Sequence, residues 1–442
     1  MHHDDTDDAD IPLQLWWALE SKAVSDRKDV LAMFENSSIW EKQTVIQTIL
    51  GRLMQRWVIA GGDQNYAACS HLLKLAPSVK EAGPLINGLQ EGLRGRDVTA
   101  LSAELVKALQ PFQAEFEKES LSLALRQGQQ EAIDKALVTI ADDHAAIGER
   151  LSYIRIFGEV NRPESVPVLL KLMESGQSSA AIKQGSLEAL MRYNNPKIGS
   201  RVVGAYPDKL RADPFVRAAA LTLLASRKPW AVQLLNAIAR EKKPGEKFIA
   251  HTIDKTDVPV EIVHQLTLLK DPDITETVSR LWPETAPVSQ DERNSQITRV
   301  SQLLKSGAGD PLAGRLIFNS MCGRCHRLFE DGASLGPDLT GYDRKNISDF
   351  LTHVIDPGAY IREGYGTYRI TTTDGRSLLG SIKGRSGSTI IIQPYSVGQI
   401  TLSIDQVKDM EEQKISMMPE RLLDGLSDQH IRDMVSYITK DL

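Results

Sequence analysis

Two cysteines and a histidine stand close together in the last third of the chain, in the segment Cys322-Gly-Arg-Cys325-His326. In a C-x-x-C-H sequence the two thiols can add to the vinyl groups of a porphyrin, and the adjacent imidazole can bind the iron. The spacing therefore predicts one covalently attached haem c, with Cys322 and Cys325 as attachment points and His326 as an iron ligand.

Two other chemistries use paired cysteines at this spacing, a structural zinc site and thiol–disulfide exchange. Zinc would need further ligands, but the only other cysteine, Cys69, lies far upstream in a helical stretch. Disulfide exchange would require a βαβ frame, whereas residues 314–321 predict a helix that leads directly into Cys322. We therefore expect haem at these cysteines.

Further residues around this segment resemble class I c-type cytochromes. Gly314 and Phe318 precede the cysteines on one helical face, and Gly336-Pro337 follows the histidine in the sequence GPDLTG. By this resemblance the carbonyl of Pro337 would accept a hydrogen bond from Nδ1 of His326 and would orient Nε2 toward the iron.

The resemblance also implies a sixth iron ligand in a loop before the last helix. Met418 precedes Pro419, and proline favours an extended backbone at the preceding residue, which suits a side chain held out from a loop. We expect Met418 to be this ligand. The other candidates in the sequence are Met410, Met417, His353 and His430.

The last helix is expected to begin after an N-cap, Ser427, and to carry an apolar stripe as far as Ile438. By the same resemblance it would cross the first helix near Gly314 and Phe318, with Tyr437 as the aromatic partner. Both axial positions of the iron would then be filled, which favours electron transfer over catalysis at the iron. The alternatives are a haem enzyme, either a peroxidase or a dehydrogenase component, and a protein-binding scaffold with a secondary haem.

Residues from about 12 to 281 predict helix after helix, because apolar residues recur every three or four positions. Three segments can be superposed through Pro163, Pro196 and Pro229, which are 33 positions apart. In each, an apolar helix is followed by a polar turn, a proline that suits a first helical turn, and a second apolar stripe. The segments resemble HEAT repeats and predict an α-solenoid. An irregular helical bundle is the alternative.

The sequence thus predicts a mainly α protein with two parts. We expect a HEAT-like helical repeat domain over residues 1–290, a linker over residues 291–310, where the composition has turned polar, and an all-α cytochrome c-like domain over residues 311–442.

A small β-sheet is expected as an insertion in the second part, at about residues 365–410. Three runs there are rich in β-branched residues: TYRITTT, STIIIQP and QITLSI. Asp374-Gly375 predicts a hairpin turn, and the Gly/Ser cluster at residues 384–388 predicts another. The insertion separates the predicted haem attachment segment from the predicted methionine ligand.

The whole arrangement resembles the planctomycete/verrucomicrobial-type haem-binding domain proteins, most specifically in residues 312–342 and 414–438. That family implies an N-terminal β-propeller, similar to sugar dehydrogenases, that would pass electrons to the haem. The propeller is absent from this sequence. We therefore expect an electron-accepting module, from a fragment or a split gene, with a sugar or alcohol dehydrogenase or another redox protein as its partner.

Composition excludes several other classes. The chain has 442 residues, with 52 basic and 58 acidic side chains and a net charge of −6, which does not indicate a nucleic-acid binder. No apolar run approaches the roughly 18 residues that a transmembrane helix requires. The first ten residues contain five Asp and do not have the pattern of a secretory signal. Haem c attachment nevertheless implies a periplasmic or other extracytoplasmic location.

Overall fold

A computed structural model describes residues 8, 10–95, 101–112, 116–239, 252–285, 288–385, 389–394 and 397–440. The fold is mainly α-helical with a small antiparallel sheet, so the predicted mainly α class is confirmed. Two predictions fall largely outside the described residues. They concern the N-terminal stretch, where the sequence lacks the pattern of a secretory signal, and residues 386–388 of the predicted Gly/Ser turn. No helix among the described residues has both the length and the apolar character that crossing a bilayer requires.

The first helices form a packed group with its own hydrophobic core. Trp57 is fully buried in this core, and its indole Nε1 donates a hydrogen bond to the carbonyl of Ala23 at 2.7 Å. A Cβ atom at Gly88 would lie 2.0 Å from the carbonyl oxygen of Gly51. The helix that contains Gly51 and the helix that contains Gly88 therefore cross in direct backbone contact. The helices are α1 (Ile11–Ala23), α2 (Arg27–Met33), α3 (Leu50–Ala60), α4 (Asp63–Leu75), α5 (Val79–Gly92) and α6 (Ala103–Leu109).

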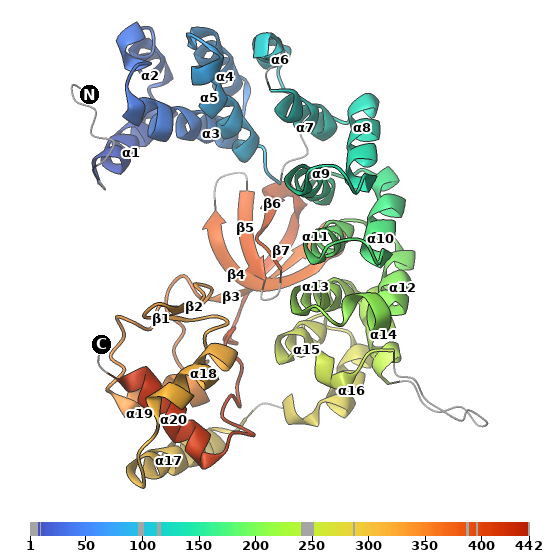
Figure 1. The fold of residues 1–442 in the computed structure, drawn as a ribbon, viewed down its shortest axis with the longest axis vertical. Coiled ribbons are helices and arrows are strands. Elements are labelled where there is room, and N and C mark those ends of the chain that lie inside the picture. Colours follow the sequence, from blue (N-terminus) through green and yellow to red (C-terminus); the bar gives the residue numbers. More distant parts are fainter. Residues whose placement is uncertain are drawn as a thin grey trace.

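The helices that follow are stacked in two rows, with each helix contacting its neighbours in the same row. The inner row consists of α9 (Ile147–Glu159), α11 (Ala180–Leu190), α13 (Pro214–Ala225) and α15 (Val260–Thr267). The outer row consists of α8 (Gln130–Ala141), α10 (Val166–Glu174), α12 (Pro196–Ala205), α14 (Lys228–Ile238) and α16 (Pro272–Leu281), and α7 (Glu117–Gln127) joins the rows to the first group. Together α1–α16 curve around an open side, and we refer to them as the helical arc (Figure 1).

The three superposed prolines lie in the first turns of outer-row elements, as the sequence predicts. Pro196 is the first residue of α12, and the side chain of Asn195 caps that helix by accepting a hydrogen bond from the Lys197 amide at 3.0 Å. Pro229 is in the first turn of α14, and Pro163 begins the short 3₁₀ turn that leads into α10. Proline is tolerated at such positions because the amide it lacks would have no helical partner.

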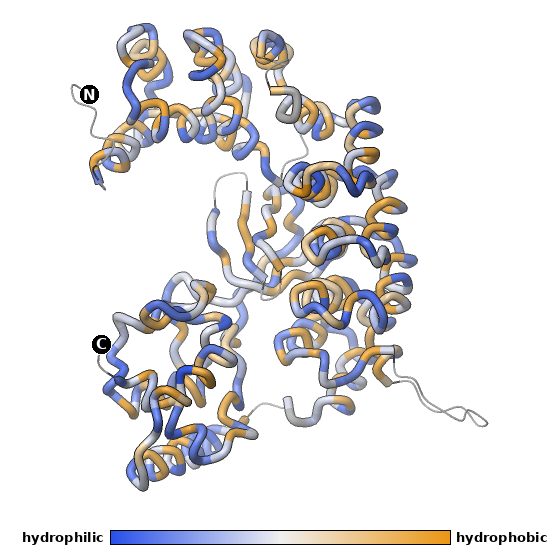
Figure 2. The backbone as a smooth tube through the Cα atoms, viewed as in Figure 1, coloured by the Kyte–Doolittle hydropathy of each residue, from blue (hydrophilic) through white to orange (hydrophobic). Residues whose placement is uncertain are grey.

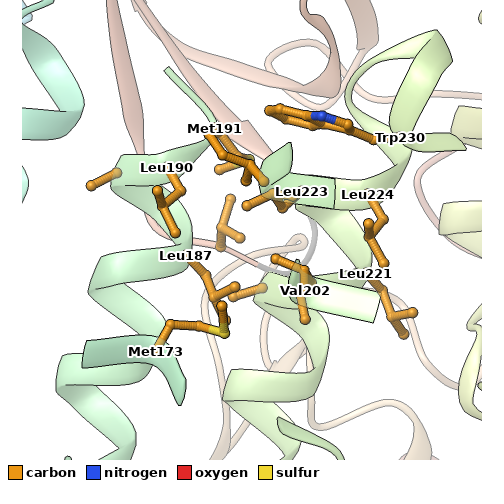
Figure 3. Packing of buried hydrophobic residues seen from close by; sticks show 14 of the residues in the cluster. Met173, Leu187, Leu190, Met191, Val202, Leu221, Leu223, Leu224 and Trp230 are labelled. Atoms are coloured by element: carbon orange, nitrogen blue, oxygen red, sulfur yellow. The ribbon is translucent and has the colours of Figure 1, made fainter. Parts of the chain in front are cut away.

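One continuous core runs through both rows. Hydrophobic side chains from α10 to α14 pack against one another there, among them Met173, Leu187 and Leu224, with Trp230 at one end (Figure 3). Along each helix of the arc, hydrophobic residues alternate with hydrophilic ones (Figure 2). The alternation gives each helix one face for its neighbours and one for the exterior.

The predicted β insertion is a five-stranded antiparallel sheet with the strand order β6-β5-β4-β3-β7. Its own small core includes Ile370, Leu378 and Ile392. The predicted turn at Asp374-Gly375 joins β3 to β4, and Gly375 has a positive φ of 87° that favours glycine. The strands are β3 (Thr367–Thr372), β4 (Ser377–Arg385), β5 (Thr389–Pro394), β6 (Ile400–Ser403) and β7 (Val407–Gln413). We refer to residues 367–413 as the β insert.

The β insert lies on the open side of the helical arc, against its inner row (Figure 1). The Ser377 amide donates a hydrogen bond to the Ser226 carbonyl at 2.8 Å, and Nε2 of Gln265 donates to the Ser377 carbonyl at 3.1 Å. Val397 is buried in the core of the arc rather than in the core of the sheet. The insert therefore covers part of the inner surface of the helical arc.

A buried ion cluster adds to this contact. The carboxylate of Asp374 pairs with Arg192 and Arg227 of the arc and, at 3.0 Å, with Nε of Arg376 in its own hairpin. Arg227 also donates to the carbonyl of Met191 at 3.1 Å, at the end of α11. Burial would raise the pKa of Asp374, but the guanidinium of Arg376 and the other donors around the carboxylate lower it to about 2.

The C-terminal unit contains α17 (Gln290–Lys305), α18 (Pro311–Met321), α19 (Ile347–Ile355), α20 (Asp428–Thr439) and a two-stranded ladder of β1 (Arg327–Leu328) and β2 (Asp331–Gly332). The prediction of a linker at residues 291–310 is wrong for most of this segment, because the structure has helix α17 there. Val300 of this helix is fully buried in the same core as Phe318 and Leu351. The polar sequence of α17 reflects a helix that buries only a narrow stripe.

Candidate functional site

Helix α18 positions the cysteine segment. Asp310 caps the helix by accepting a hydrogen bond from the Leu312 amide at 2.8 Å, and Pro311 is its first residue. The helix ends at Cys322, where the carbonyl accepts hydrogen bonds from the amides of Cys325 at 3.0 Å and His326 at 2.8 Å. The two thiols and the imidazole therefore follow one another in a single tight turn.

The imidazole of His326 is held by the contact that the cytochrome resemblance implies. Its Nδ1 lies 2.8 Å from the carbonyl oxygen of Pro337 and donates a hydrogen bond to it in the Nδ1–H tautomer. A Cβ atom at Gly336 would be 2.7 Å from the ring, so the backbone there must pack directly against the imidazole. Burial lowers the pKa of His326, and the Pro337 carbonyl partly opposes this by raising it. The ring is therefore neutral at pH 7, with Nε2 left as an acceptor.

The thiols of Cys322 and Cys325 are not joined in a disulfide. Burial raises the pKa of Cys322 to about 12, and Cys325 adds to the effect. The pKa of Cys325 is also raised, first by burial and then by the carboxylate of Glu261, while Arg324 opposes the shift. Both side chains are therefore protonated at neutral pH.

Helices α18 and α20 cross at the place that the cytochrome resemblance implies. A Cβ atom at Gly314 would lie 1.9 Å from the carbonyl oxygen of Asp433, so only glycine allows α18 and α20 to approach this closely. The rings of Phe318 and Tyr437 have centroids 5.5 Å apart in a tilted arrangement. The Tyr437 hydroxyl donates to Asp331 at 2.6 Å and so ties α20 to the ladder that follows His326.

Met418 lies in the loop between β7 and α20. Its side chain is half-buried against the hydrophobic core of the C-terminal unit, on which Cys322 also packs. Its amide donates to Oγ of Ser416 at 3.1 Å, which fixes the backbone just before Pro419.

The other candidates for the sixth ligand lie in different surroundings. Met410 is in β7 opposite Ile370 and packs on the core of the sheet, so it belongs to the β insert. His353 is hydrogen-bonded to Tyr342 at 3.1 Å, and His430 is exposed at the start of α20. Met417 is half-buried next to Met418.

Two residues near the site come from parts of the chain that the sequence did not connect with it. Glu261 of α15 interacts electrostatically with Arg324 and Cys325, so the inner row of the helical arc forms one side of the site. Lys383 of β4 donates to the carbonyl of Leu335 at 3.4 Å, just before the Gly336-Pro337 segment. Neither residue stands in a motif, and only the folded chain brings them here.

Among the described residues, no group of three or more His, Cys, Asp and Glu side chains is arranged to hold a metal ion. The candidate site that the sequence predicts comprises the cysteine turn, the Pro337 carbonyl and the Met418 loop. No family model matches the chain, and no curated protein matches it.

Proposed function

We propose that the C-terminal unit binds one haem c covalently through Cys322 and Cys325 and transfers single electrons, with His326 and Met418 as axial ligands. The observation that carries the proposal is the 2.8 Å contact between Nδ1 of His326 and the Pro337 carbonyl. Such a bond is what an iron-binding histidine requires, because it fixes the tautomer and leaves Nε2 free for the metal. When bound between a nitrogen and a sulfur ligand, haem supplies a one-electron couple with a raised reduction potential.

The surrounding residues would act by positioning the ligands. The close crossing of α18 and α20 at Gly314 fixes the helix that ends at Cys322. Ser416 and Pro419 hold the backbone on either side of Met418. The β insert reaches the loop of Pro337 through Lys383. A dehydrogenase or another redox protein remains our proposal for the electron donor.

The first test is covalent haem retention. The full chain would be produced with an added export signal in cells that carry a cytochrome maturation system, and a denaturing gel would be stained for haem. We expect a stained band for the wild-type chain and none for the Cys322→Ala/Cys325→Ala variant. A colourless wild-type protein that is exported and folded would refute the proposal.

The second test concerns the sixth ligand. The oxidised protein is expected to show an absorption band from the bond between sulfur and iron. Met418→Ala should remove this band, whereas Met417→Ala, the matched control next to it, should retain it. The opposite result would assign the bond to Met417. A band absent from the wild-type chain would favour an open iron site and the peroxidase alternative.

A further inference from the structure

Helix α17 contacts the loop that carries Met418 through charged and polar side chains. The loop comprises residues 414–427, and we refer to it as the ligand loop. All of its residues are described, and none lies in a helix or a strand. A segment without regular backbone hydrogen bonding depends on other elements for a fixed conformation. The contacts with α17 therefore bear on where the side chain of Met418 lies.

One contact joins Arg293 of α17 to Glu420, two positions after Met418. Nη2 of Arg293 donates a hydrogen bond to Oε1 of Glu420 at 2.6 Å, and the two side chains are 19% and 32% exposed. Nε of the same guanidinium lies 3.5 Å from the carboxylate of Asp356, at the end of α19. A hydrogen bond between two charged groups is stronger than one between neutral groups, and partial burial reduces its screening by salt.

The sequence of α17 places Arg293 on the buried side of the helix. Arg293, Ile297 and Val300 follow one another at intervals of four and three residues, which brings them onto one face. Val300 is fully buried, and Ile297 packs on the same core. Met418 and Leu423 of the ligand loop pack on that core too. Arg293 therefore extends the buried stripe of α17 to the place where the ligand loop meets it.

Further contacts follow along α17. Arg421 pairs with Glu292 at 3.3 Å, and Asp424 accepts a hydrogen bond from Nε2 of Gln296 at 3.0 Å. Arg421 has a positive φ of 60°, an uncommon conformation that persists only where surrounding contacts fix the backbone. Helix α17 thus holds the ligand loop at Glu420, Arg421 and Asp424.

The helical arc also approaches Glu420, because His264 of α15 interacts electrostatically with this carboxylate. Burial lowers the pKa of His264, and Glu420 opposes this only in part, so the imidazole is neutral at pH 7. At this pH the positive charge on Glu420 therefore comes from Arg293 rather than from His264.

We propose that Arg293 is a positioning residue for the sixth iron ligand: by holding Glu420, it keeps the ligand loop closed and the thioether of Met418 on the iron. The inference rests on the proposed haem site. Arg293 acts through Glu420 and not on the iron itself. When the pair is broken, the ligand loop opens more often, and the sixth position of the iron becomes exchangeable while the loop is open.

The test is imidazole binding to the matured, oxidised full-length chain at pH 7, followed through the absorption band assigned to the sulfur–iron bond. Imidazole can enter only while Met418 is off the iron, so its apparent affinity measures the open fraction. Glu420→Gln keeps the shape of the side chain and removes its charge, and we expect imidazole to bind this variant about tenfold more tightly than the wild type.

Asp428→Asn is the matched control and should leave the affinity for imidazole unchanged. Asp428 also pairs with α17, through Arg299 at 3.1 Å, but it lies beyond the ligand loop in the first turn of α20. Equal affinities of Glu420→Gln and Asp428→Asn for imidazole would overturn the proposal.

Variants of Arg293 distinguish the pair from a general loss of stability. Arg293→Met should tighten imidazole binding as Glu420→Gln does, and Arg293→Lys, which keeps the positive charge, should restore most of the wild-type behaviour. The double variant Arg293→Met/Glu420→Gln should be no more open than Arg293→Met, because both changes remove the same interaction. Additive effects, or the absence of rescue by lysine, would contradict the assignment to this pair.

The haem-free chain separates a failure of this inference from a failure of the proposed function. In the full-length Cys322→Ala/Cys325→Ala protein, adding Glu420→Gln should make the amides of residues 420–426 exchange about tenfold faster. Unchanged exchange would overturn the contact itself. Faster exchange with unchanged imidazole affinity would mean that the pair holds the loop but not the ligand, and the proposal would be wrong. A colourless matured chain would end the haem proposal and the ligand role together, and faster exchange would then support the contact alone.

Discussion

Asp374 is the single anion among three guanidinium groups that join the β insert to the helical arc. We expect Asp374→Asn to weaken this contact, because the amide keeps the shape of the carboxylate but removes its charge. Arg227 and Arg376 would then remain buried, with side-chain exposures of 3% and 4%, without an anionic partner.

The magnitude follows from the pKa of Asp374, which is lowered from 3.8 to about 2. At about 1.4 kcal/mol per pKa unit, the ionised form contributes roughly 2.5 kcal/mol to the free energy of unfolding. Asp374→Ala should lower the free energy of unfolding further, by about 3 to 5 kcal/mol, because it also removes the side-chain oxygens that accept hydrogen bonds from the buried arginines. Since the folded pKa is lowered, the contribution is complete above pH 3.8 and is lost as the pH falls toward 2.

The assay is hydrogen exchange of the full chain at pH 7 and at lower pH, read at the amides of β3 and β4. A local readout is needed because a chain with several cores need not unfold in one step. The matched control is Asp409→Asn, in which Arg369 keeps Glu411 at 2.7 Å, and which should cost less than about 0.5 kcal/mol. Equal protection in the two variants, or a difference that grows in acid, would refute the reasoning.

Two further predictions concern the crossing of α18 and α20. Gly314→Ala should force the two helices apart and lower the free energy of unfolding by about 2 kcal/mol, which would be measured as faster hydrogen exchange in both helices. Gly341→Ala is the control and should have little effect, because an added Cβ atom there has no other atom within 4 Å. Tyr437→Phe removes a donor from Asp331, whose pKa is lowered to about 2, first by Arg315 and then by Tyr437. The pKa of Asp331 should rise in an NMR titration but stay below 3.8, and an unchanged value would contradict the assignment of this hydrogen bond.

Much of the local structure could be predicted because short-range patterns determine it. The prolines of the repeats mark first helical turns, and the contact between His326 and Pro337 was expected from the resemblance of the local sequence to c-type cytochromes. Strands β3, β5 and β6 match the three runs rich in β-branched residues. The predicted turn at Asp374-Gly375 implies a strand at β4, but no run rich in β-branched residues marks this strand, because it contains Gly380 and Gly384. Strand β7 lies outside the three runs because it is mostly charged. Their partners in the sheet, and not their own composition, make them strands.

The long-range contacts could not be predicted in the same way. The β insert is held on the arc by an aspartate, three arginines, a glutamine and backbone groups, and nothing in their local sequence indicates which distant segment they meet. The same is true of Glu261, which reaches the cysteine turn from α15. The polar composition of residues 291–310 suggested a linker because α17 buries so little of its surface. Each of these wrong or missing predictions concerns a tertiary contact that leaves no periodic pattern or fixed spacing in the sequence.

The position of the β insert has a consequence for how the two halves of the chain can move. The polypeptide passes from the arc to the C-terminal unit before α17, then leaves that unit to build the sheet and returns to it ahead of Met418. Because the sheet is held against the arc, three chain segments connect the C-terminal unit to the rest of the protein: the segment before α17, the segment that leads to β3 and the segment that follows β7. A body with a single tether can pivot, whereas a body with three tethers can only tilt slightly. Any partner that approaches the cysteine turn must therefore fit a nearly rigid frame.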